Sequence, residues 1–381
     1  MAVTVEALKG RMLDADSHLQ VPPKHLDEAL GPVFAGMLRQ FWARMASARG
    51  TSVDQLNPIQ GRPEPPTAEN VWTAKMNAAA GAFDPAARLQ TLDLMGVDRQ
   101  LMFPMAVPAS MMLSKRPEAF DVSRHHNDYV LDWAKDGNGR LRPVAVINMN
   151  EVQPAIDELE RVIGKGAYAV NIGCGRPPAG LSPADAAWEP FWARLEEAGV
   201  PVLFHIGGEV GFVDPAWGAT PNLRPSTRGS QDPLDGETVS PYTLTAGAFA
   251  PANYLATLIL DGVLERHPGL RLGAIEMTAQ WVGPLAEVLD QRFEVFSRLR
   301  SFLSMRPSEY INRQVRVTPF WWEPVGKYLE RFGLEDVYVF STDFPHVEGG
   351  TEPVQRFWAS LDGHSDEVYE KFFVTNAALI I

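Results

Sequence analysis

Residues 167–207 carry two short apolar runs, AYAVNIG (Ala167–Gly173) and PVLFHIG (Pro201–Gly207), with a helical pattern at Pro183–Ala198 between them. Apolar residues follow one another within each run instead of alternating with polar ones. Continuous apolarity is typical of strands that are covered on both faces, as in a parallel sheet. The helical segment is followed by Gly199, a residue that commonly terminates helices. This stretch therefore predicts a strand–helix–strand unit in a parallel sheet.

The same alternation recurs along the whole chain. Further apolar runs lie at residues 11–16, 99–105, 142–149, 270–277, 314–320 and 337–344. Helical patterns cover residues 85–95, 117–135, 151–165, 246–266, 278–300, 323–332 and 367–380. Eight strands alternating with helices predict a single (β/α)8 TIM barrel over residues 1–381. A doubly wound open sheet is the alternative, but no glycine-rich dinucleotide turn follows the first run.

Two long stretches interrupt this alternation. Residues 19–83 follow the first strand and residues 208–243 follow the fifth, and both are rich in residues that favour turns. Both leave from the carboxyl ends of strands, where the active-site loops of a barrel lie. We therefore expect a mouth insertion and a lid-like loop within one domain, with surface decoration as the alternative.

The composition bounds the class of protein. The chain has 381 residues and a formal net charge of −13, so its overall field is poorly suited to nucleic acid or an anionic membrane. The one cysteine, Cys174, excludes an intrachain disulfide. The first residues lack the apolar core of a signal peptide, and no apolar stretch is long enough to predict a transmembrane helix. We expect a cytoplasmic protein that acts on a small molecule.

Four potential metal ligands lie at the ends of three predicted strands. Asp16 and His18 are two residues apart, so on a strand they point to the same side. His205 ends the fifth strand and Asp343 ends the eighth. Imidazoles and carboxylates together suit Zn²⁺, Mn²⁺ or Fe²⁺, and four protein ligands leave a position for water. The combination at three strand ends predicts one divalent metal ion at the mouth of the barrel.

The chain resembles the amidohydrolase superfamily, in the branch that contains aminocarboxymuconate-semialdehyde decarboxylase. The resemblance rests on DADSH (14–18), RLQTLDLMGVDRQLMFP (88–104), FHIGG (204–208), GVLERHPGLRLGAIE (262–276), FSTDFPH (340–346) and FFVTNAALI (372–380). It implies a barrel with a divalent metal held by Asp16, His18, His205 and Asp343. It also implies a supporting role for His346 and a homodimer.

Two positions depart from the pattern of that branch. Many relatives carry His-x-His on the first strand, whereas this chain has Asp16 in the first position. The additional carboxylate favours Mn²⁺ without excluding Zn²⁺. The characterised decarboxylases have a catalytic histidine at the end of the sixth strand, where this chain has Glu276. A carboxylate beside a metal-bound water can accept its proton, so we assign catalytic roles to Glu276 and Asp343.

Three functions remain open at this point. Glu276 favours a metal-dependent hydrolase of a small cyclic or aromatic lactone or amide, and we prefer this interpretation by a small margin. The alternative is a nonoxidative decarboxylase of an aromatic or unsaturated acid, in which Asp343 protonates the carbon that loses carbon dioxide. A non-catalytic ligand-binding barrel is a distant third, because clustered ligands without an ion would leave buried charge uncompensated.

Three arginines are candidates to bind a substrate carboxylate. Arg224 and Arg228 lie in the loop after the fifth strand, and Arg176 follows the fourth. A guanidinium group can bind a carboxylate through two parallel hydrogen bonds, although a solvated loop charge is an equally good explanation. Cys174 is expected to be a buried, unreactive thiol.

Overall fold

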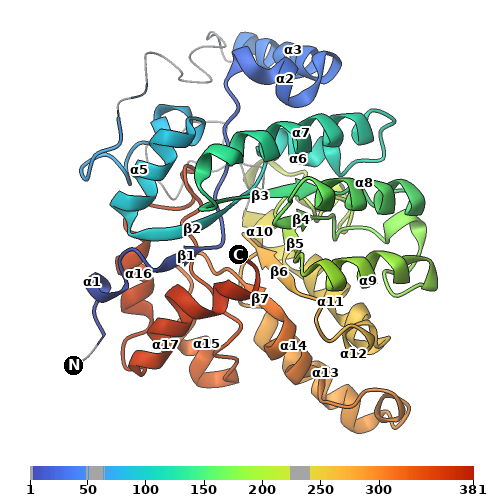
Figure 1. Cartoon of the computed structure of the whole chain (residues 1–381). Helices are drawn as coiled ribbons and strands as arrows, with labels where there is room; N and C mark the ends of the chain where they lie inside the picture. Colours follow the sequence, from blue (N-terminus) through green and yellow to red (C-terminus); the bar gives the residue numbers. More distant parts are fainter. Residues whose placement is uncertain (1–2, 49, 51–62, 64, 224–240) are drawn as a thin grey trace.

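The computed structural model describes residues 3–48, 50, 63, 65–223 and 241–381. Seven parallel strands form one sheet in sequence order, as Figure 1 shows. They are β1 (Met12–Asp14), β2 (Val97–Met102), β3 (Leu141–Val146), β4 (Ala169–Asn171), β5 (Val202–His205), β6 (Leu272–Ile275) and β7 (Val315–Val317). Each strand overlaps one of the predicted apolar runs, which confirms the first seven of them.

Residues 337–344 close the sheet into a barrel between β7 and β1. On one side Val339 N donates to Val317 O at 3.1 Å, and on the other Ala15 N donates to Phe340 O at 3.1 Å. The predicted eighth strand therefore lies where expected, but it makes isolated bridges with its neighbours instead of a regular ladder. Because both sides of this segment are bonded, the doubly wound open sheet is wrong.

Helices surround the sheet (Figure 1). The predicted helical patterns correspond to α5 (Pro85–Met95), α7 (Ala119–Trp133), α8 (Val152–Gly164), α9 (Glu189–Ala198), α11 (Phe249–Leu260), α12 (Val263–Arg266), α13 (Val282–Val295), α15 (Val325–Phe332) and α17 (Asp366–Glu370). The remaining helices are α1 (Val5–Leu8), α2 (Leu26–Leu30), α3 (Pro32–Ala48), α6 (Ala106–Met112), α10 (Pro241–Gly247), α14 (Pro307–Gln314) and α16 (Pro353–Ser360). The sequence analysis did not predict this second group.

The bounds of α5 show how local sequence sets these elements. The side chain of Asp84 accepts a hydrogen bond from Ala87 N at 2.8 Å, and Pro85 occupies the first turn, where its missing N–H is not needed. The helix ends at Gly96, whose φ of 77° is in the left-handed region that favours glycine. β2 begins at the next residue, Val97, so the glycine cap connects α5 directly to the sheet.

The core has two layers, which explains why the strands read as continuously apolar. Inside the barrel a small cluster contains Leu13, Ala15, Leu101, Phe103, Val144, Ala169, Leu203, Ile275, Val339, Ala377 and Ile380. A larger cluster fills the space between the sheet and the helices. Ile380 lies near Gly273 in β6, so the C-terminal segment fills the end of the barrel opposite the mouth. Figure 1 places the C-terminus at the centre of the ring.

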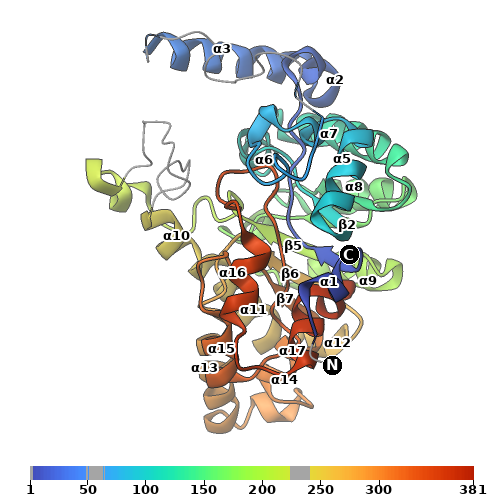
Figure 2. The same ribbon diagram turned by 90° about the vertical axis from the view of Figure 1, so that its left-hand side faces the viewer.

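The insertion after β1 is partly helical. It contains α2 and α3, and α2 packs against α7 on the outside of the barrel. Figure 2 shows α3 extending away from the barrel. In the loop after β5, short 3-10 turns lie at Pro215–Gly218 and Pro221–Leu223, and residues 224–240 lie outside the described part. The roles of these two stretches as mouth insertion and lid remain predictions.

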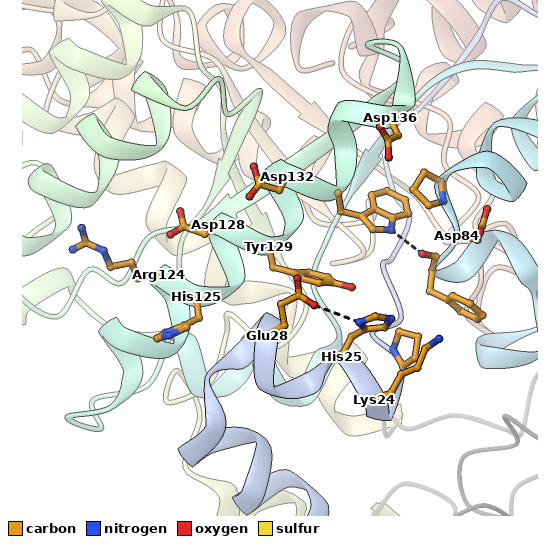
Figure 3. A pocket seen from close by; sticks show the side chains of 14 residues that line it. Lys24, His25, Glu28, Asp84, Arg124, His125, Asp128, Tyr129, Asp132 and Asp136 are labelled. Atoms are coloured by element: carbon orange, nitrogen blue, oxygen red, sulfur yellow. Dashed lines mark hydrogen bonds and ion pairs between the residues drawn. The ribbon is translucent and has the colours of Figure 1, made fainter.

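A groove of about 690 Å³ lies outside the barrel, between α2 and α7 (Figure 3). Two of its acidic side chains have partners on the helical layer: Glu28 pairs with His25 at 3.3 Å, and Asp128 contacts Arg161 and Lys165, each at 2.5 Å. The groove is therefore a surface feature of the helical layer and not the mouth of the barrel.

One helical stretch in the described residues, Pro241–Leu260, is long and apolar enough to cross a membrane by length and composition. Half of it is buried inside the structure, and α11 within it contacts α12, α13 and α14. Core helices of soluble proteins have the same composition, so this stretch is weak evidence for a membrane span.

The buried histidine of α7 makes folding sensitive to acid. His126 is 2% exposed, neither of its ring nitrogens has a hydrogen-bond partner among the described residues, and burial lowers its pKa to about 4. Since an unfolded histidine titrates near 6.5, the unfolded state takes up the proton first as the pH falls. This one residue should remove about 2 kcal/mol from the free energy of unfolding between pH 7.5 and pH 5.

Chemical denaturation of His126→Phe and of the wild type at both pH values tests this. Between pH 7.5 and pH 5, the free energy of unfolding of the wild type should fall by that amount relative to that of His126→Phe. His125→Gln, at the exposed neighbouring position, should show the pH dependence of the wild type. Parallel pH dependence of the wild type and His126→Phe would contradict the assignment.

Candidate metal centre

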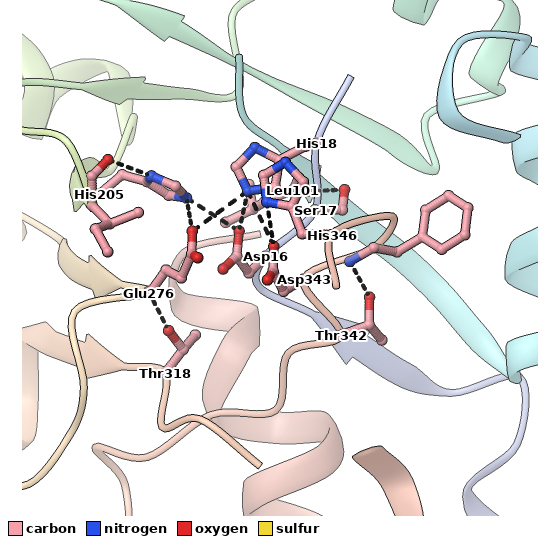
Figure 4. A network of polar contacts seen from close by, with 12 residues as sticks. Asp16, Ser17, His18, Leu101, His205, Glu276, Thr318, Thr342, Asp343 and His346 are labelled. Atoms are coloured by element: carbon pink, nitrogen blue, oxygen red, sulfur yellow. Dashed lines mark hydrogen bonds and ion pairs between the residues drawn. The ribbon is translucent and has the colours of Figure 1, made fainter. Parts of the chain in front are cut away.

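Five polar side chains from four strand ends meet at the mouth of the barrel (Figure 4). Asp16 and His18 follow β1, His205 ends β5, Glu276 follows β6, and Asp343 lies in the closing segment. Each of these residues is 5% exposed or less. The parallel sheet brings them together because all its strands end at the same rim.

The contacts among these side chains are those of ligands around one ion. His18 Nε2 lies 3.5 Å from Asp16 Oδ1, 3.6 Å from Glu276 Oε2 and 3.3 Å from Asp343 Oδ1. His205 Nε2 lies 3.4 Å from Asp16 Oδ1 and 3.2 Å from Glu276 Oε2. Bonds of about 2.1 Å to a central cation put neighbouring ligand atoms about 3.0 to 3.4 Å apart. A divalent cation therefore fits between them.

Both histidines present the nitrogen that a metal requires. His18 Nδ1 lies 3.1 Å from Pro104 O, and His205 Nδ1 lies 3.0 Å from Ile206 O. A backbone carbonyl only accepts, so each Nδ1 carries the proton and each Nε2 keeps its lone pair. In both residues that Nε2 points toward the carboxylates (Figure 4). The second interaction of each ring thus fixes the tautomer that can bind an ion.

The buried carboxylates of the centre also favour the binding of a cation. Burial, followed by the negative charge of Asp343, raises the pKa of Asp16 and of Glu276 well above the ordinary range. Burial opposes ionisation of Asp343 as well, but the charge of the neighbouring His346 lowers the pKa of Asp343 far below its usual value. Burial lowers the pKa of His205 to about 3, which keeps its imidazole neutral. Carboxylates this close repel one another unless a cation lies between them.

The two carboxylates with assigned catalytic roles both have strained backbones. The φ angle is +54° at Glu276 and +50° at Asp343, in the left-handed region that residues with side chains rarely adopt. Glu276 N donates to Thr318 Oγ1 at 2.8 Å, which holds the strained turn in place. Such strain typically costs about 1–3 kcal/mol per residue and persists where the surroundings impose it, often at functional sites.

His346 lies directly behind Asp343. Its Nδ1 is 3.0 Å from Asp343 Oδ1, its Nε2 is 3.1 Å from Gln20 Nε2, and its ring stacks on His18 with centroids 3.8 Å apart. Together with His18, Glu276 and Asp343 it forms a second set of atoms close enough to share an ion. The supporting role assigned to His346 is compatible with these contacts and remains a prediction, as do the ligand and catalytic roles of the other residues.

Residues 15–380 match the family profile described as amidohydrolase. The chain belongs to this amidohydrolase family. Among curated relatives, gamma-resorcylate decarboxylase from Rhodococcus jostii is 22% identical over 315 residues, which cover 77% of this chain and 86% of the relative. The expected family is therefore confirmed.

Solved structures share the fold over nearly the whole chain. An amidohydrolase from Mycobacterium avium subsp. paratuberculosis superimposes with a TM-score of 0.67 at 21% identity, covering 97% of this chain and 99% of that one. 5-Carboxyvanillate decarboxylase from Novosphingobium aromaticivorans superimposes with a TM-score of 0.63 at 17% identity, covering 100% and 99%. The latter structure contains manganese and 3-methoxy-4-hydroxy-5-nitrobenzoic acid. At these identities the likeness confirms the TIM-barrel fold alone.

The amidohydrolase carries a buried arginine beneath its metal centre. Arg88, on α5, donates to His18 O at 2.6 Å and to Gln100 Oε1 at 2.8 Å, and it also contacts Gly81 O in the insertion. Gln100 Nε2 in turn donates to Asp14 Oδ2 at 2.5 Å. One guanidinium group thus connects the segment after β1, which carries the predicted ligands Asp16 and His18, to β2 and to the insertion.

Asp14 extends this support to the closing segment. Thr342 donates to Asp14 through its backbone N at 2.8 Å and through its hydroxyl at 2.6 Å. Burial raises the pKa of Asp14 to about 6, so its ionised form at neutral pH depends on these donors. Because Thr342 directly precedes Asp343, the same network fixes ligands at both ends of the chain.

The structure describes one of the three predicted substrate-binding arginines. Arg176 is exposed after β4, and it lines a cavity of about 180 Å³ at the ends of β3–β5 and an apolar cavity of about 370 Å³ beside the loop after β5. Arg224 and Arg228 lie outside the described residues. Cys174 is buried, as expected, and burial raises the pKa of its thiol.

Two charged residues near the centre were missed by the sequence analysis. Glu348 is 9% exposed and lines a small cavity with Asp16, Glu276 and Asp343. It follows the STDFPH motif closely, and this proximity was the available signal. Lys75 reaches the same region from the insertion after β1, and its sequence context carries no comparable signal.

The arginine network predicts an effect on metal binding. Arg88→Lys keeps the buried charge, but three different guanidinium nitrogens bind Gly81, Gln100 and His18 O, and the single nitrogen of an ammonium group cannot occupy all three positions. We expect the Kd for Mn²⁺ to rise by about tenfold or more, the range typical of residues that support metal ligands. Isothermal titration calorimetry measures this, with circular dichroism to verify the fold. Arg99→Lys, which lies on β2 next to Gln100 but pairs with Asp98, is the control. An unchanged Kd in Arg88→Lys would refute the role.

Removing one carboxylate should reveal the repulsion in the metal-free protein. The pKa of Glu276 is raised, so its ionisation destabilises the fold progressively as the pH rises above the usual value of about 4.5. Metal-free Glu276→Gln should therefore melt a degree or more above the wild type at pH 8, and at the same temperature near pH 4.5. It should also lose much of the stabilisation by Mn²⁺. Differential scanning calorimetry tests both points against exposed Glu287→Gln; a lower melting temperature at pH 8 would contradict the expectation.

Proposed function

We propose that this amidohydrolase is a metal-dependent, nonoxidative decarboxylase of an aromatic acid. The observation that carries the proposal is the convergence of Asp16, His18, His205 and Glu276 on one ion-sized space, with Asp343 grouped beside His18 and Glu276. The named activities of the relatives favour decarboxylation over the hydrolysis that the sequence analysis preferred. The earlier alternative thus becomes the main hypothesis.

The donor set supports one divalent cation as the cofactor. Asp16, His18, His205 and Asp343 would hold it, as the family resemblance implies, and Glu276 adds a fifth donor. Three carboxylates make the set rich in hard oxygen ligands, which favours Mn²⁺ over Zn²⁺. The manganese in the 5-carboxyvanillate decarboxylase structure supports the same choice. When bound, the cation would polarise oxygen atoms of the substrate and neutralise the ligand carboxylates.

Asp343 is the proposed proton donor to carbon. Its Oδ1 lies within ion-pair distance of His18 and His346, and neither of its carboxylate oxygens has a hydrogen-bond partner within the described chain. His346, whose Nδ1 lies 3.0 Å from Asp343 Oδ1, would first pass a proton to the ionised Asp343. The bond between the ring carbon and the carboxylate then breaks, carbon dioxide leaves, and the ring carbon takes that proton from Asp343. Proton transfer by a positioned group typically contributes about 10²–10⁴-fold to rate.

Further parts of the proposal come from the sequence. Arg176 would contact the substrate from the end of β4, and Arg224 and Arg228 would approach from the loop after β5. Residues 19–83 and 208–243 would cover the mouth and exclude water. We also propose a cytoplasmic homodimer that acts on a small molecule and does not bind nucleic acid or a membrane.

Hydrolysis remains the second candidate because of Glu276. Its carboxylate lies 3.2 Å from His205 Nε2, at the strand end that carries a histidine in the decarboxylases resembled by the sequence. A glutamate here could accept a proton from a water molecule as that water attacks a lactone or amide carbonyl. The two candidates differ in their products, so they can be separated directly.

Carbon dioxide release is the deciding measurement. Protein loaded with Mn²⁺ or Zn²⁺ is incubated with a panel of hydroxybenzoates, and in parallel with lactones and aromatic amides. We expect metal-dependent release of carbon dioxide, and in D₂O one deuterium at the carbon that lost it. Asp343→Asn should lower kcat by about 100-fold or more, whereas Asp362→Asn, at an exposed position, should not. Hydrolysis without carbon dioxide release would replace the proposal by the second candidate.

A further inference from the structure

The insertion after β1 is tied to the loop that follows Asp343. Lys75 Nζ donates to Gly350 O at 2.6 Å, and the next residue, Met76, donates its backbone N to Pro345 O at 2.8 Å. Met76 adopts a φ of +52°, which is unusual for a residue with a side chain. Two neighbouring residues of the insertion therefore contact both ends of residues 345–350. This fixes the position of the half-buried Lys75 ammonium group.

The loop that Lys75 contacts forms one wall of the metal centre. Glu348 and Gly349 line the small cavity that also contains Asp16, Glu276 and Asp343. The loop cannot move away easily, because Trp321 Nε1 donates to Glu348 O at 2.8 Å. It is also closely packed, since a Cβ atom on Gly349 would lie 2.0 Å from the Thr342 carbonyl oxygen.

The negative charge of the metal centre makes a positively charged side chain at this wall favourable for binding an acid. The ionised carboxylates of Asp16, Glu276 and Asp343 exceed the charge of a divalent ion by one unit, and Glu348 adds a further negative charge nearby. An acid substrate would bring its own negative charge into this buried region. Such a group binds only if a positive charge lies within reach of it.

Lys75 has the charge and the free donors to meet this need. The negative charges of Asp343 and Glu348 both act on it, and burial lowers its pKa to about 8, so it is mostly protonated at pH 7. An ammonium group has three donors, and the side chain makes one hydrogen bond within the described residues, to Gly350 O. Two donors remain for a ligand.

We propose that Lys75 binds a carboxylate of the substrate and so makes the site selective for aromatic acids over the corresponding neutral phenols. This inference rests on the proposed function, because it assumes an acid substrate at the metal centre. It assigns the insertion after β1 a part in substrate recognition, through a residue about 60 positions from the first metal ligand.

A purely structural role for Lys75 predicts a different outcome. In that case its function would be to hold Gly350, and any side chain that donates a hydrogen bond could replace it. Lys75→Gln keeps a donor and removes the charge, whereas Lys75→Arg keeps both. Comparing these two variants therefore separates charge from anchoring. Lys135→Gln, which removes an exposed lysine paired with Asp132, is the matched control.

The experiment measures binding of two probes to the manganese-loaded protein by calorimetry. The probes are 3-methoxy-4-hydroxy-5-nitrobenzoic acid and 2-methoxy-6-nitrophenol, which lacks only the carboxylate. The wild type, Lys75→Arg and Lys135→Gln should prefer the acid. Lys75→Gln should bind the acid about tenfold more weakly and the phenol within about twofold of the wild type. Equal weakening of both probes, unchanged binding of the acid, or no preference in the wild type would each overturn the inference.

The same proteins distinguish this inference from the proposed function. Carbon dioxide release by the wild type, with unchanged acid binding and KM in Lys75→Gln, would leave the decarboxylase standing and overturn the role of Lys75. Selective loss of acid binding in Lys75→Gln, without carbon dioxide release from any acid by any of the proteins, would support Lys75 as an acid-binding residue and remove the decarboxylase.

Discussion

Mutual repulsion among Asp16, Glu276 and Asp343 is the constraint around which this barrel is built. Three carboxylates buried within contact of two imidazoles would separate in a flexible structure, since like charges interact strongly where water is excluded. Each is held by a different strand end, and two of them have strained backbones. The network of Arg88, Gln100 and Asp14 below them contributes rigidity instead of neutralising charge. The protein thus maintains a concentrated negative charge that a divalent cation can compensate.

The fold could be predicted from sequence because a strand that is covered on both faces has a recognisable pattern, a short run of consecutive apolar residues. LFHIGG and LRLGAIE are apolar without alternation, and the structure covers both faces of β5 and β6. The spacing of Asp16 and His18 was equally informative, because two residues along a strand return a side chain to the same face. The eighth segment had the same apolar character, yet at residues 337–344 the ladder breaks into isolated bridges. Sequence predicts that a segment is extended and buried, but not how regularly its backbone pairs.

The features that sequence could not provide are long-range contacts. Lys75 and Gly350 are 275 positions apart, and nothing local to either residue specifies their hydrogen bond. The helices α2 and α3 were missed for a different reason, because the prolines and glycines around them suggested turns. Glu276 misled the functional interpretation, since a glutamate near a metal suits hydrolysis as well as it suits ligation. The named activities of the relatives are the reason why decarboxylation is the function proposed above.

Closure of the barrel between β1 and residues 337–344 links the stability of the protein against proteolysis to the supply of the metal ion. The metal centre draws on residues near both ends of the chain, so no partial structure that lacks the last segment can assemble it. An ion that binds only the complete fold shifts the folding equilibrium by mass action, in proportion to the logarithm of its free concentration. Metal supply would then govern how much of the protein survives proteolysis as well as how much is active. In a cell short of the ion, the metal-free fold would be less stable and therefore more exposed to proteolysis.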